Sequence, residues 1–288
     1  MSDVRARVGG QLSSVYEIRC AVPAESVIVK VYDDQWRWKQ AKEVFVYRLL
    51  SDHGVGPVPT ILRVEQDTGL LGCAYTVMTR LPGRPLSHLS ADLDAAQVAH
   101  VYRQLGATLS AIHRIGQASY GYLTTRILDP EPDNTTYMKR QFAKKLAEFD
   151  QLGGDPELQA AVRTYVASRT GLLRNCAAPV LCHNDFHEGN ILVDRAADGW
   201  TVTGFIDVEN AIAADPLIDL AKTDYYSVQR NPVKRTALLA GYGPLPADWP
   251  ERSALYRLYH AVELWDWFAS IGETSPLPGI AADIRQLT

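Results

Sequence analysis

The chain has 288 residues, of which 47% are hydrophobic and 22% are charged, and 29 Lys and Arg stand against 33 Asp and Glu for a net charge of −4. Such a composition is that of a soluble globular protein, and it excludes an intrinsically disordered or collagen-like chain. The slight acidic excess argues against a protein that binds nucleic acid by neutralising its phosphates.

Several features that the sequence lacks narrow the expected compartment and partners. The N-terminal residues MSDVRARVGG hold no apolar core of a secretion signal, and charges interrupt every apolar stretch before about 18 residues, the length that a membrane helix needs. The four cysteines are too few and too scattered for a disulfide scaffold, which favours free thiols in a reducing compartment. We therefore expect a cytoplasmic protein, a monomer or weak dimer, with no membrane or nucleic-acid partner.

The N-terminal part of the chain predicts strands around one helix. Short β-rich runs occur at residues 4–8, 15–20, 27–32, 61–65 and 74–78. Gly9-Gly10 separates the first two runs as a hairpin turn would, and apolar residues at helical spacing predict a helix over 35–53 that ends at Gly54. These elements form a small mixed β-sheet with one helix packed on it.

After a turn-rich break at residues 81–85, the sequence changes to long amphipathic helices. Helical patterns cover residues 95–115, 135–149, 157–173, 216–226, 233–241 and 248–271. Short strands interrupt these helices at 179–186 and 201–207. The sequence therefore predicts an α+β protein with an N-terminal lobe over residues 1–80 and a mainly helical C-terminal lobe over residues 81–288.

A dense polar loop between apolar strands carries most of the chemical information. It reads His183-Asn184-Asp185-Phe186-His187-Glu188-Gly189-Asn190, and polar groups packed between buried strands cost free energy unless they find partners. The spacing of Asp185 and Asn190 equals that of the Asp and Asn in the kinase catalytic loop. Asp207 ends the next strand, so two carboxylates and an amide oxygen form a site suited to Mg²⁺. The alternative is that Asp185 and Asp207 only cap turns.

The N-terminal part supplies a second set of candidates. Lys30 lies in an otherwise apolar strand, from which its ammonium group can reach phosphates, and Glu43 on the following helix could hold it in place. The alternative is that Lys30 extends to solvent from an edge strand and that Glu43 is solvated. The hairpin at residues 9–14 is small and polar enough to cover phosphates with backbone N–H groups, although it matches neither common glycine-rich phosphate loop.

These blocks resemble the aminoglycoside phosphotransferase family, relatives of the protein kinases that phosphorylate small molecules. The resemblance covers nearly the whole chain, and its most specific parts are residues 183–192, 204–209 and 215–221. The family usually has Gly where this chain has Asn184. No Arg precedes Asp185 and no Phe-Gly follows Asp207, which makes a protein substrate improbable.

The resemblance implies a protein-kinase-like fold with two lobes and a nucleotide between them, ATP or alternatively GTP, bound with Mg²⁺. Asp185 is similar to the catalytic base, Asn190 and Asp207 to the Mg²⁺ ligands, Lys30 to the phosphate-binding lysine and Glu43 to its partner. Asp219 matches a carboxylate that braces the catalytic loop. The remaining nucleotide-binding positions are expected at Gly10, Gln11, Leu12, Ser13, Ser14, Met78, Thr79 and Leu81.

One helix offers a prediction for the acceptor. Over residues 248–271, polar and aromatic side chains recur at helical spacing opposite an apolar face. Carboxylates beside aromatic rings suit a cationic, hydroxylated ligand, whereas the alternative is an ordinary solvated helix face. The predicted substrate contacts are Glu209, His260, Glu263, Asp266 and Trp267.

We therefore predict a phosphotransferase that moves the γ-phosphate of a nucleoside triphosphate to a hydroxyl of a small molecule. The family points to an aminoglycoside or another hydroxylated antibiotic, and hence to resistance by inactivation. The main alternative is a kinase of a primary metabolite such as an amino sugar, choline or a fructosamine. Two further alternatives are a kinase-like binding protein without activity and a zinc module made of Cys176, Cys182, His183 and His187, whose cysteine spacing is wider than usual.

Overall fold

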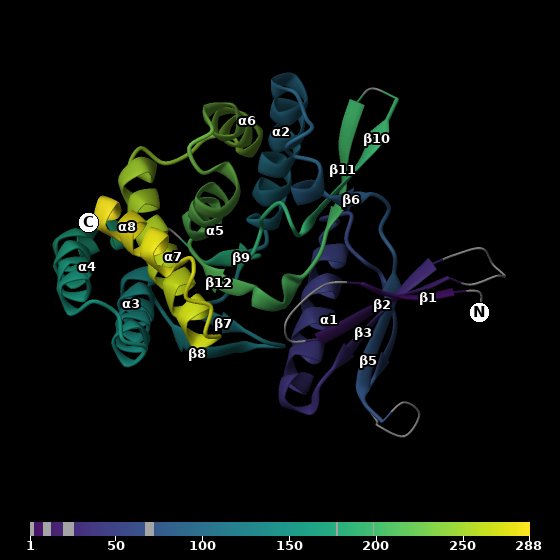
Figure 1. The fold of residues 1–288 in the computed structure, drawn as a ribbon, viewed down its shortest axis with the longest axis horizontal. Coiled ribbons are helices and arrows are strands. Elements are labelled where there is room, and N and C mark those ends of the chain that lie inside the picture. Colours follow the sequence, from purple (N-terminus) through teal and green to yellow (C-terminus); the bar gives the residue numbers. More distant parts are fainter. Residues whose placement is uncertain (1–2, 8–12, 20–25, 67–71, 177, 198) are drawn as a thin grey trace.

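The computed structural model describes residues 3–7, 13–19, 26–66, 72–176, 178–197 and 199–288. The N-terminal part is a five-stranded sheet in the order β1-β2-β3-β5-β4. Its strands are β1 (Asp3–Arg7), β2 (Ser13–Arg19), β3 (Ser26–Tyr32), β4 (Ile61–Glu65) and β5 (Ala74–Thr79). Helix α1 (Arg37–Asp52) packs beside this sheet and faces the rest of the molecule (Figure 1).

The sheet is antiparallel at every described pairing, so the prediction of a mixed sheet was wrong. The chain leaves β3, passes through α1 and returns as β4 in the same direction as β3. A parallel pair would result if the two strands were neighbours, but β5 lies between them and is antiparallel to both. The helix crossover therefore adds no parallel contact to this sheet.

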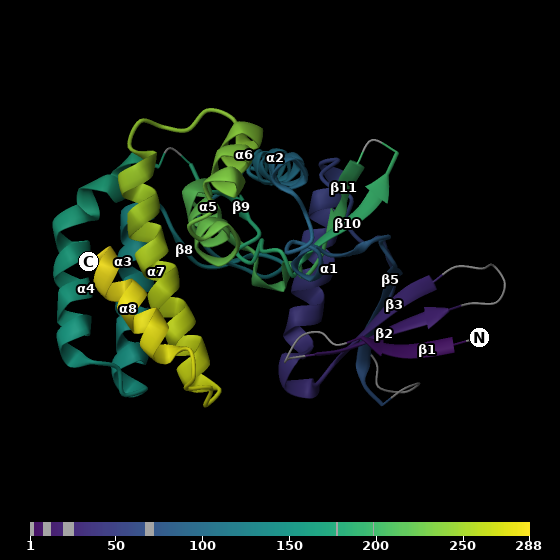
Figure 2. The same ribbon diagram turned by 45° about the horizontal axis from the view of Figure 1, so that its top comes forward.

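The rest of the chain is mainly helical. Its longer helices are α2 (Ala95–Ile112), α3 (Asn134–Gln151), α4 (Pro156–Arg169), α5 (Pro216–Thr223), α6 (Pro232–Tyr242), α7 (Trp249–Ser270) and α8 (Leu277–Leu287). Shorter helical segments are η1 (Asp34–Trp36), η2 (Leu86–His88), η3 (Thr170–Asn175), η4 (Val208–Asn210) and the π-helical η5 (Asp224–Val228). Figure 2 shows α3, α4, α7 and α8 grouped at the end of the molecule far from the five-stranded sheet.

Two small sheets join the helices to the N-terminal part. One has the order β11-β10-β6 and the other β8-β7-β12-β9. Their strands are β6 (Arg84–Pro85), β7 (Tyr120–Leu123), β8 (Ile127–Glu131), β9 (Val180–Cys182), β10 (Ile191–Ala196), β11 (Gly199–Phe205) and β12 (Ile212–Ala214). The loop between β9 and β10 and the end of β11 consequently meet beside α1.

Several elements differ from the sequence prediction. The hairpin β7–β8, the strand β12 and the helix α8 were not anticipated, because they are short or follow turn-rich segments. The strand expected at 179–186 ends at Cys182, where the polar loop begins. The helix expected over 216–226 ends at Thr223 and continues as the π-helical η5.

The helices pack closely around one apolar core. At Gly106 on α2 an added Cβ would lie 2.0 Å from the carbonyl oxygen of Leu238, and at Gly241 on α6 it would lie 1.9 Å from that of Arg103. Only glycine fits at these two contacts, which set the distance between α2 and α6. No helix in the described part of the chain is long and apolar enough to cross a membrane.

Candidate active site

The polar loop between β9 and β10 is held together by its own side chains. Asn190 donates through Nδ2 to the backbone oxygen of Asp185 at 2.9 Å and to its Oδ2 at 3.3 Å, and Asn210 donates to the same Oδ2 at 3.3 Å. The carboxylate of Asp185 is therefore oriented by two amides, while its side chain is 20% exposed. The loop presents this carboxylate with an accessible oxygen.

Asp219 on α5 binds the start of the loop between β9 and β10. Its carboxylate accepts the backbone N–H groups of His183 and Asn184, each at 2.6 Å, and contacts His113 at 3.2 Å. Burial alone would raise the pKa of Asp219, but the hydrogen bond and charge of His113 outweigh it and hold that pKa below its ordinary value. The carboxylate is thus ionised and fixes the loop to α5.

The departure of Asn184 from the family pattern has a backbone explanation. Asn184 has φ +59°, in the left-handed region that Gly adopts freely and that Asn tolerates better than most residues. Its side chain adds a hydrogen bond from Nδ2 to the backbone oxygen of Asn210 at 3.2 Å. Asn184 therefore occupies a left-handed backbone position that Gly would also accept.

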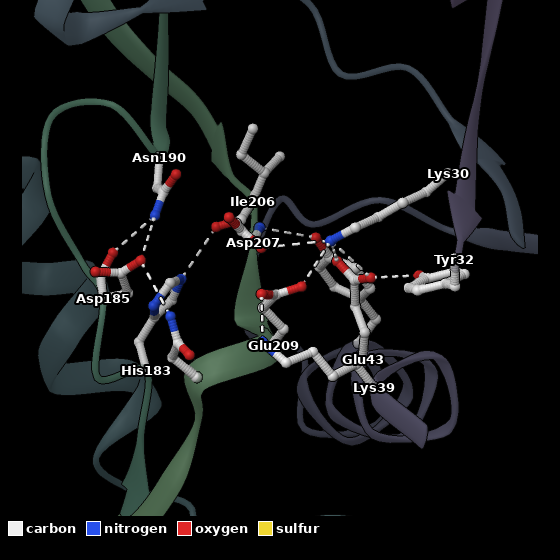
Figure 3. Close-up of polar contacts among 12 residues, drawn as sticks. Lys30, Tyr32, Lys39, Glu43, His183, Asp185, Asn190, Ile206, Asp207 and Glu209 are labelled. Carbon is white, nitrogen blue, oxygen red and sulfur yellow. Dashed lines mark hydrogen bonds and ion pairs between the residues drawn. The ribbon is translucent and has the colours of Figure 1, made fainter. Parts of the chain in front are cut away.

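Asp207 lies at the end of β11, opposite the loop. It also has a left-handed backbone, φ +64°, and its N–H donates to the hydroxyl of Tyr47 on α1 at 3.0 Å. Figure 3 shows Asp207 between the Asp185–Asn190 pair on one side and Lys30 on the other. Its position joins the catalytic loop to the N-terminal sheet.

Lys30 on β3 lies at the centre of a buried charge cluster. Its Nζ is 3.1 Å from Glu43, 3.1 Å from Glu209 and 3.4 Å from Asp207. Burial alone would lower the pKa of Lys30, but these carboxylates outweigh burial and keep that pKa well above its usual value. The ammonium group is charged, and its ion pairs connect the N-terminal sheet to α1 and to the residues that follow β11.

Two further lysines of α1 contact the C-terminal part. Lys39 is 3.0 Å from Glu209, and burial of Glu209 is outweighed by Lys30 and Lys39, which lower its pKa. Lys42 is buried with its Nζ 3.8 Å from the ring centroid of Tyr122 and without a hydrogen-bond partner, and burial lowers its pKa to about 7. The first contact holds α1 against the segment that follows Asp207, and the second holds α1 against β7.

The donor set around Asp207 fits a hard divalent cation. Asn190 uses its Nδ2 for Asp185, so its carbonyl oxygen is free of that interaction, and the Asp207 side chain is 32% exposed. Carboxylate and amide oxygens with room for water are the ligands that Mg²⁺ prefers.

The other predicted nucleotide contacts lie on the N-terminal part where the structure describes them. Ser13 and Ser14 begin β2 and pair with Tyr32 and Val31 of β3, next to Lys30. Met78 and Thr79 end β5, and Leu81 follows where the chain enters the helical part. Gly10, Gln11 and Leu12 lie outside the described residues.

A model of the phosphotransferase enzyme family matches residues 3–255. The chain belongs to this family. A stretch of 87 residues is also 33% identical to N-acetylmuramate/N-acetylglucosamine kinase from Caulobacter vibrioides, but that match spans 24% of this chain and 24% of the relative. The protein is therefore an enzyme, a small-molecule phosphotransferase.

Solved structures with the same fold include mutants of two aminoglycoside phosphotransferases. A thermostable mutant of APH(4)-Ia in its apo form has 17% identity and a TM-score of 0.73, and the match covers 99% of this chain and 94% of the mutant. A ternary complex of such a mutant with ADP and hygromycin B has 17% identity, TM-score 0.72 and coverage of 99% and 93%. A mutant aminoglycoside 2'-phosphotransferase-IIIa bound to GDP has 14% identity, TM-score 0.70 and coverage of 99% and 91%. These matches confirm the predicted α+β, protein-kinase-like fold.

The residues predicted to contact the substrate of this phosphotransferase are not gathered on one surface. Glu209 bridges Lys30 and Lys39, and His260 is fully buried with Nε2 2.9 Å from the backbone oxygen of Ile218. Glu263 pairs with Lys222 at 3.1 Å. Asp266 is buried with neither carboxylate oxygen hydrogen-bonded, and Trp267 is 45% exposed.

The zinc alternative finds no support in the geometry of the phosphotransferase. Cys182 contacts the backbone oxygen of Asp215, His183 that of Ile206, and Cys176 the hydroxyl of Tyr120. The one cluster of possible metal-ligating side chains among the described residues is His113, Cys182 and Asp219, whose atoms already bind one another or the loop. The four residues of the proposed zinc module are not brought together.

Sequence reasoning missed three residues that contact the site. Lys39 lies one helical turn before Glu43, so helical spacing could have placed it on the same face of α1. Asn210 and Lys222 had no comparable signal, because their positions depend on how η4 and α5 pack against the loop between β9 and β10.

Proposed function

We propose that this enzyme transfers the γ-phosphoryl group of ATP, or of GTP, to a hydroxyl group of a small molecule. The observation that carries the proposal is the convergence of Lys30, Asp185, Asn190 and Asp207 at one site. Lys30 and Asp207 are 177 positions apart in the chain, yet Nζ and Oδ1 are 3.4 Å apart. Phosphoryl transfer depends mainly on positioning and charge neutralisation, which this arrangement supplies.

In the proposed reaction, Asp185 orients the acceptor hydroxyl and takes its proton as the oxygen attacks the γ-phosphorus. The bond from that phosphorus to the β–γ bridging oxygen breaks, and the nucleoside diphosphate leaves. Lys30 would bind the phosphates, while Asn190 and Asp207 would hold Mg²⁺, whose charge would offset that of the phosphate oxygens. Ser13 and Ser14 would lie near the phosphates, and the purine would bind at Met78, Thr79 and Leu81.

Two acceptor classes are supported by different comparisons. An aminoglycoside or another hydroxylated antibiotic is supported by the shared fold with APH(4)-Ia, which has been solved with hygromycin B. An amino sugar is supported by the partial match to N-acetylmuramate/N-acetylglucosamine kinase. In the first case the product is an inactivated drug, and in the second a sugar phosphate.

The test is Mg²⁺-dependent phosphate transfer from ATP to a panel of aminoglycosides, other hydroxylated antibiotics, amino sugars and choline. Asp185→Asn should lower kcat about a thousandfold while nucleotide binding survives, because a general base contributes about 10²–10⁴-fold. Asp194→Asn, a change of an exposed carboxylate on β10, is the matched control and should retain full turnover. Near-native turnover of Asp185→Asn would contradict the role of the base.

A further inference from the structure

A cavity of about 800 Å³ opens between η5, α7 and α8. Helix α8 packs along α7 (Figure 1), and η5 continues from α5 and also contacts α7. Tyr225, Tyr226, Arg230, Arg257 and Asp283 contribute its polar and aromatic lining. The volume is that of a pocket for a sugar-sized or larger molecule.

The pocket is attached directly to the catalytic loop. Ser227 on η5 accepts the backbone N–H of Glu188 at 3.0 Å, and Thr223 donates to the backbone oxygen of Phe186 at 2.8 Å. The ring of Tyr226 lies nearly parallel to that of His187, 6.4 Å between centroids, and His187 Nε2 is 3.7 Å from Asp185 Oδ1. Tyr226 of the pocket lining is therefore separated from Asp185 by the ring of His187 alone.

The segment that joins the loop to the pocket has an unusual backbone. Residues Asp224–Val228 form a π-helical turn, and Gln229 follows with φ +53°. Single π-helical turns within helices occur often at functional sites, where they re-aim side chains. Here the turn places the adjacent Tyr225 and Tyr226 side chains on the pocket.

The charges of the pocket wall favour an anion. Asp224 accepts two hydrogen bonds from Arg235, of 2.9 and 3.1 Å, and also lies 3.4 Å from Nε of Arg257. The negative charge of this carboxylate is therefore shared between two arginines. Arg257 lines the pocket, whereas Arg235 does not. The two arginines of the lining, Arg230 and Arg257, therefore stand against one lining carboxylate, that of Asp283.

The other charged residues of the pocket do not reverse this balance. Arg230 contacts the neutral side chain of Gln286 at 2.9 Å, and Asp283 accepts the hydroxyl of Tyr225 at 3.1 Å. Glu263, on the catalytic side of α7, is held by Lys222, and its pKa is lowered because Lys222 and His260 outweigh burial. A polycation would meet arginines here, with no surplus of carboxylates to bind it.

We infer that this pocket binds the part of the acceptor remote from the reacting hydroxyl, and that the acceptor is a hydroxylated sugar carrying a carboxylate rather than a polycation. A guanidinium group binds a carboxylate through paired, charge-assisted hydrogen bonds, and the tyrosine rings can stack on sugar faces. The inference rests on the proposed phosphotransfer at Asp185. It adds Arg257 and Arg230 as the residues that select the acceptor.

The test compares three probes by calorimetric binding to the full chain loaded with ADP and Mg²⁺. N-acetylmuramate carries a carboxylate, N-acetylglucosamine is its neutral counterpart, and hygromycin B is a polycation. N-acetylmuramate should bind about tenfold more tightly than N-acetylglucosamine, since a charge-assisted hydrogen bond favours the anion, and hygromycin B should bind least.

Variants assign the preference to the pocket. Arg257→Gln should reduce the advantage of N-acetylmuramate to about threefold or less, because the charge is lost and the polar side chain is kept. Arg230→Gln, at an exposed position bound only to Gln286, tests the same role at low risk to folding. Arg285→Gln is the matched control, because this α8 arginine contacts Asp155 away from the pocket and should change nothing.

The possible results separate the inference from the proposed function. Tighter binding of hygromycin B than of N-acetylmuramate, binding of none of the probes, or an unchanged preference in both Arg257→Gln and Arg230→Gln would overturn the inference. None of those results concerns the phosphotransfer itself, which is judged by the loss of turnover in Asp185→Asn. Conversely, an acidic sugar that binds in an Arg257-dependent manner but receives no phosphate would contradict the proposed function alone.

Discussion

The proposed nucleotide side of the active site, around Lys30 and Asp207, and the proposed acceptor side, at the pocket between η5, α7 and α8, are built in different ways. On the nucleotide side, Lys30 joins Glu43, Asp207 and Glu209 in a cluster with distances of 3.1–3.4 Å. On the acceptor side, the side chains that face the pocket include residues of η5, α7 and α8, and Asp283 is the carboxylate that lines it beside Arg230 and Arg257. Charges bound tightly to one another suit a reaction common to a family, whereas a looser set on packed helices suits a variable acceptor.

The largest effect is expected on the nucleotide side, from Asp207→Ala. Loss of this carboxylate removes a proposed Mg²⁺ ligand and one partner of Lys30, so kcat/KM should fall about a thousandfold, or about 4 kcal/mol. Nucleotide affinity measured with and without Mg²⁺ checks the cause, because the metal-dependent part alone should be lost. Asp194→Ala on the exposed face of β10 serves as the control. A variant whose affinity still responds to Mg²⁺ as the wild type does would rule out metal ligation by Asp207.

The variant Asp219→Ala tests how far the nucleotide side and the acceptor side depend on the loop between β9 and β10, which Asp219 holds in place. Asp219→Ala leaves the buried N–H groups of His183 and Asn184 without their acceptor, so the free energy of unfolding should fall by about 3 kcal/mol. Because the folded-state pKa of Asp219 is lowered, its contribution is present at neutral pH and is lost as the pH falls below its ordinary value of 3.8.

Denaturant unfolding of Asp219→Ala at pH 7 and at the lowest pH where the protein stays folded measures this contribution. The difference from the wild type should shrink at acid pH. Asp150→Ala, an exposed change on α3, should alter stability by less than about 0.5 kcal/mol. An Asp219→Ala protein as stable as this control would mean that the loop is held in place by other contacts.

The sequence allowed most of the nucleotide side to be predicted, for a physical reason. Asp185, Asn190 and Asp207 stand in short polar blocks bounded by apolar strands, and Lys30 stands within an apolar strand. A buried polar group needs a partner, so such residues point to one another even before their distances are known. The structure brings Lys30 and Glu43 to 3.1 Å, although the roles of these residues remain predictions.

The acceptor side could not be predicted in the same way. Helical periodicity shows which face of α7 is apolar, but α7 is covered by α3, α5 and α8 at once, so its polar face is partly buried too. His260 and Asp266 therefore lie inside the protein although their spacing predicted a ligand-facing stripe. The pocket also needs α8, whose apolar residues Leu277, Ile280 and Ile284 recur at helical spacing but were overlooked, and the π-helical turn η5, which has no such pattern.

Asp266 gives the smallest expected effect and the sharpest test of the acceptor side. Burial raises the pKa of Asp266 to about 7, with Lys145 opposing this and Glu148 and Glu263 adding to it. The folded state therefore binds this proton more tightly than the unfolded chain does, so stability is lost as the pH rises from the ordinary value of 3.8 to about 7. Asp266→Asn removes the charge with little change in size.

At or below pH 3.8, Asp266→Asn should be about as stable as the wild type, and at pH 8 it should be more stable by about 1–3 kcal/mol, since one pKa unit corresponds to about 1.4 kcal/mol. Thermal or denaturant unfolding at the two pH values measures the difference, and the exposed change Asp194→Asn should show none. The acceptor KM should stay unchanged, because Asp266 is 3% exposed and lies outside the lining of the η5–α7–α8 pocket. A raised KM with no gain in stability would instead make Asp266 a substrate contact, as the polar and aromatic spacing on α7 predicted. The acceptor would then bind at the carboxylates of α7 and not at Arg230 and Arg257.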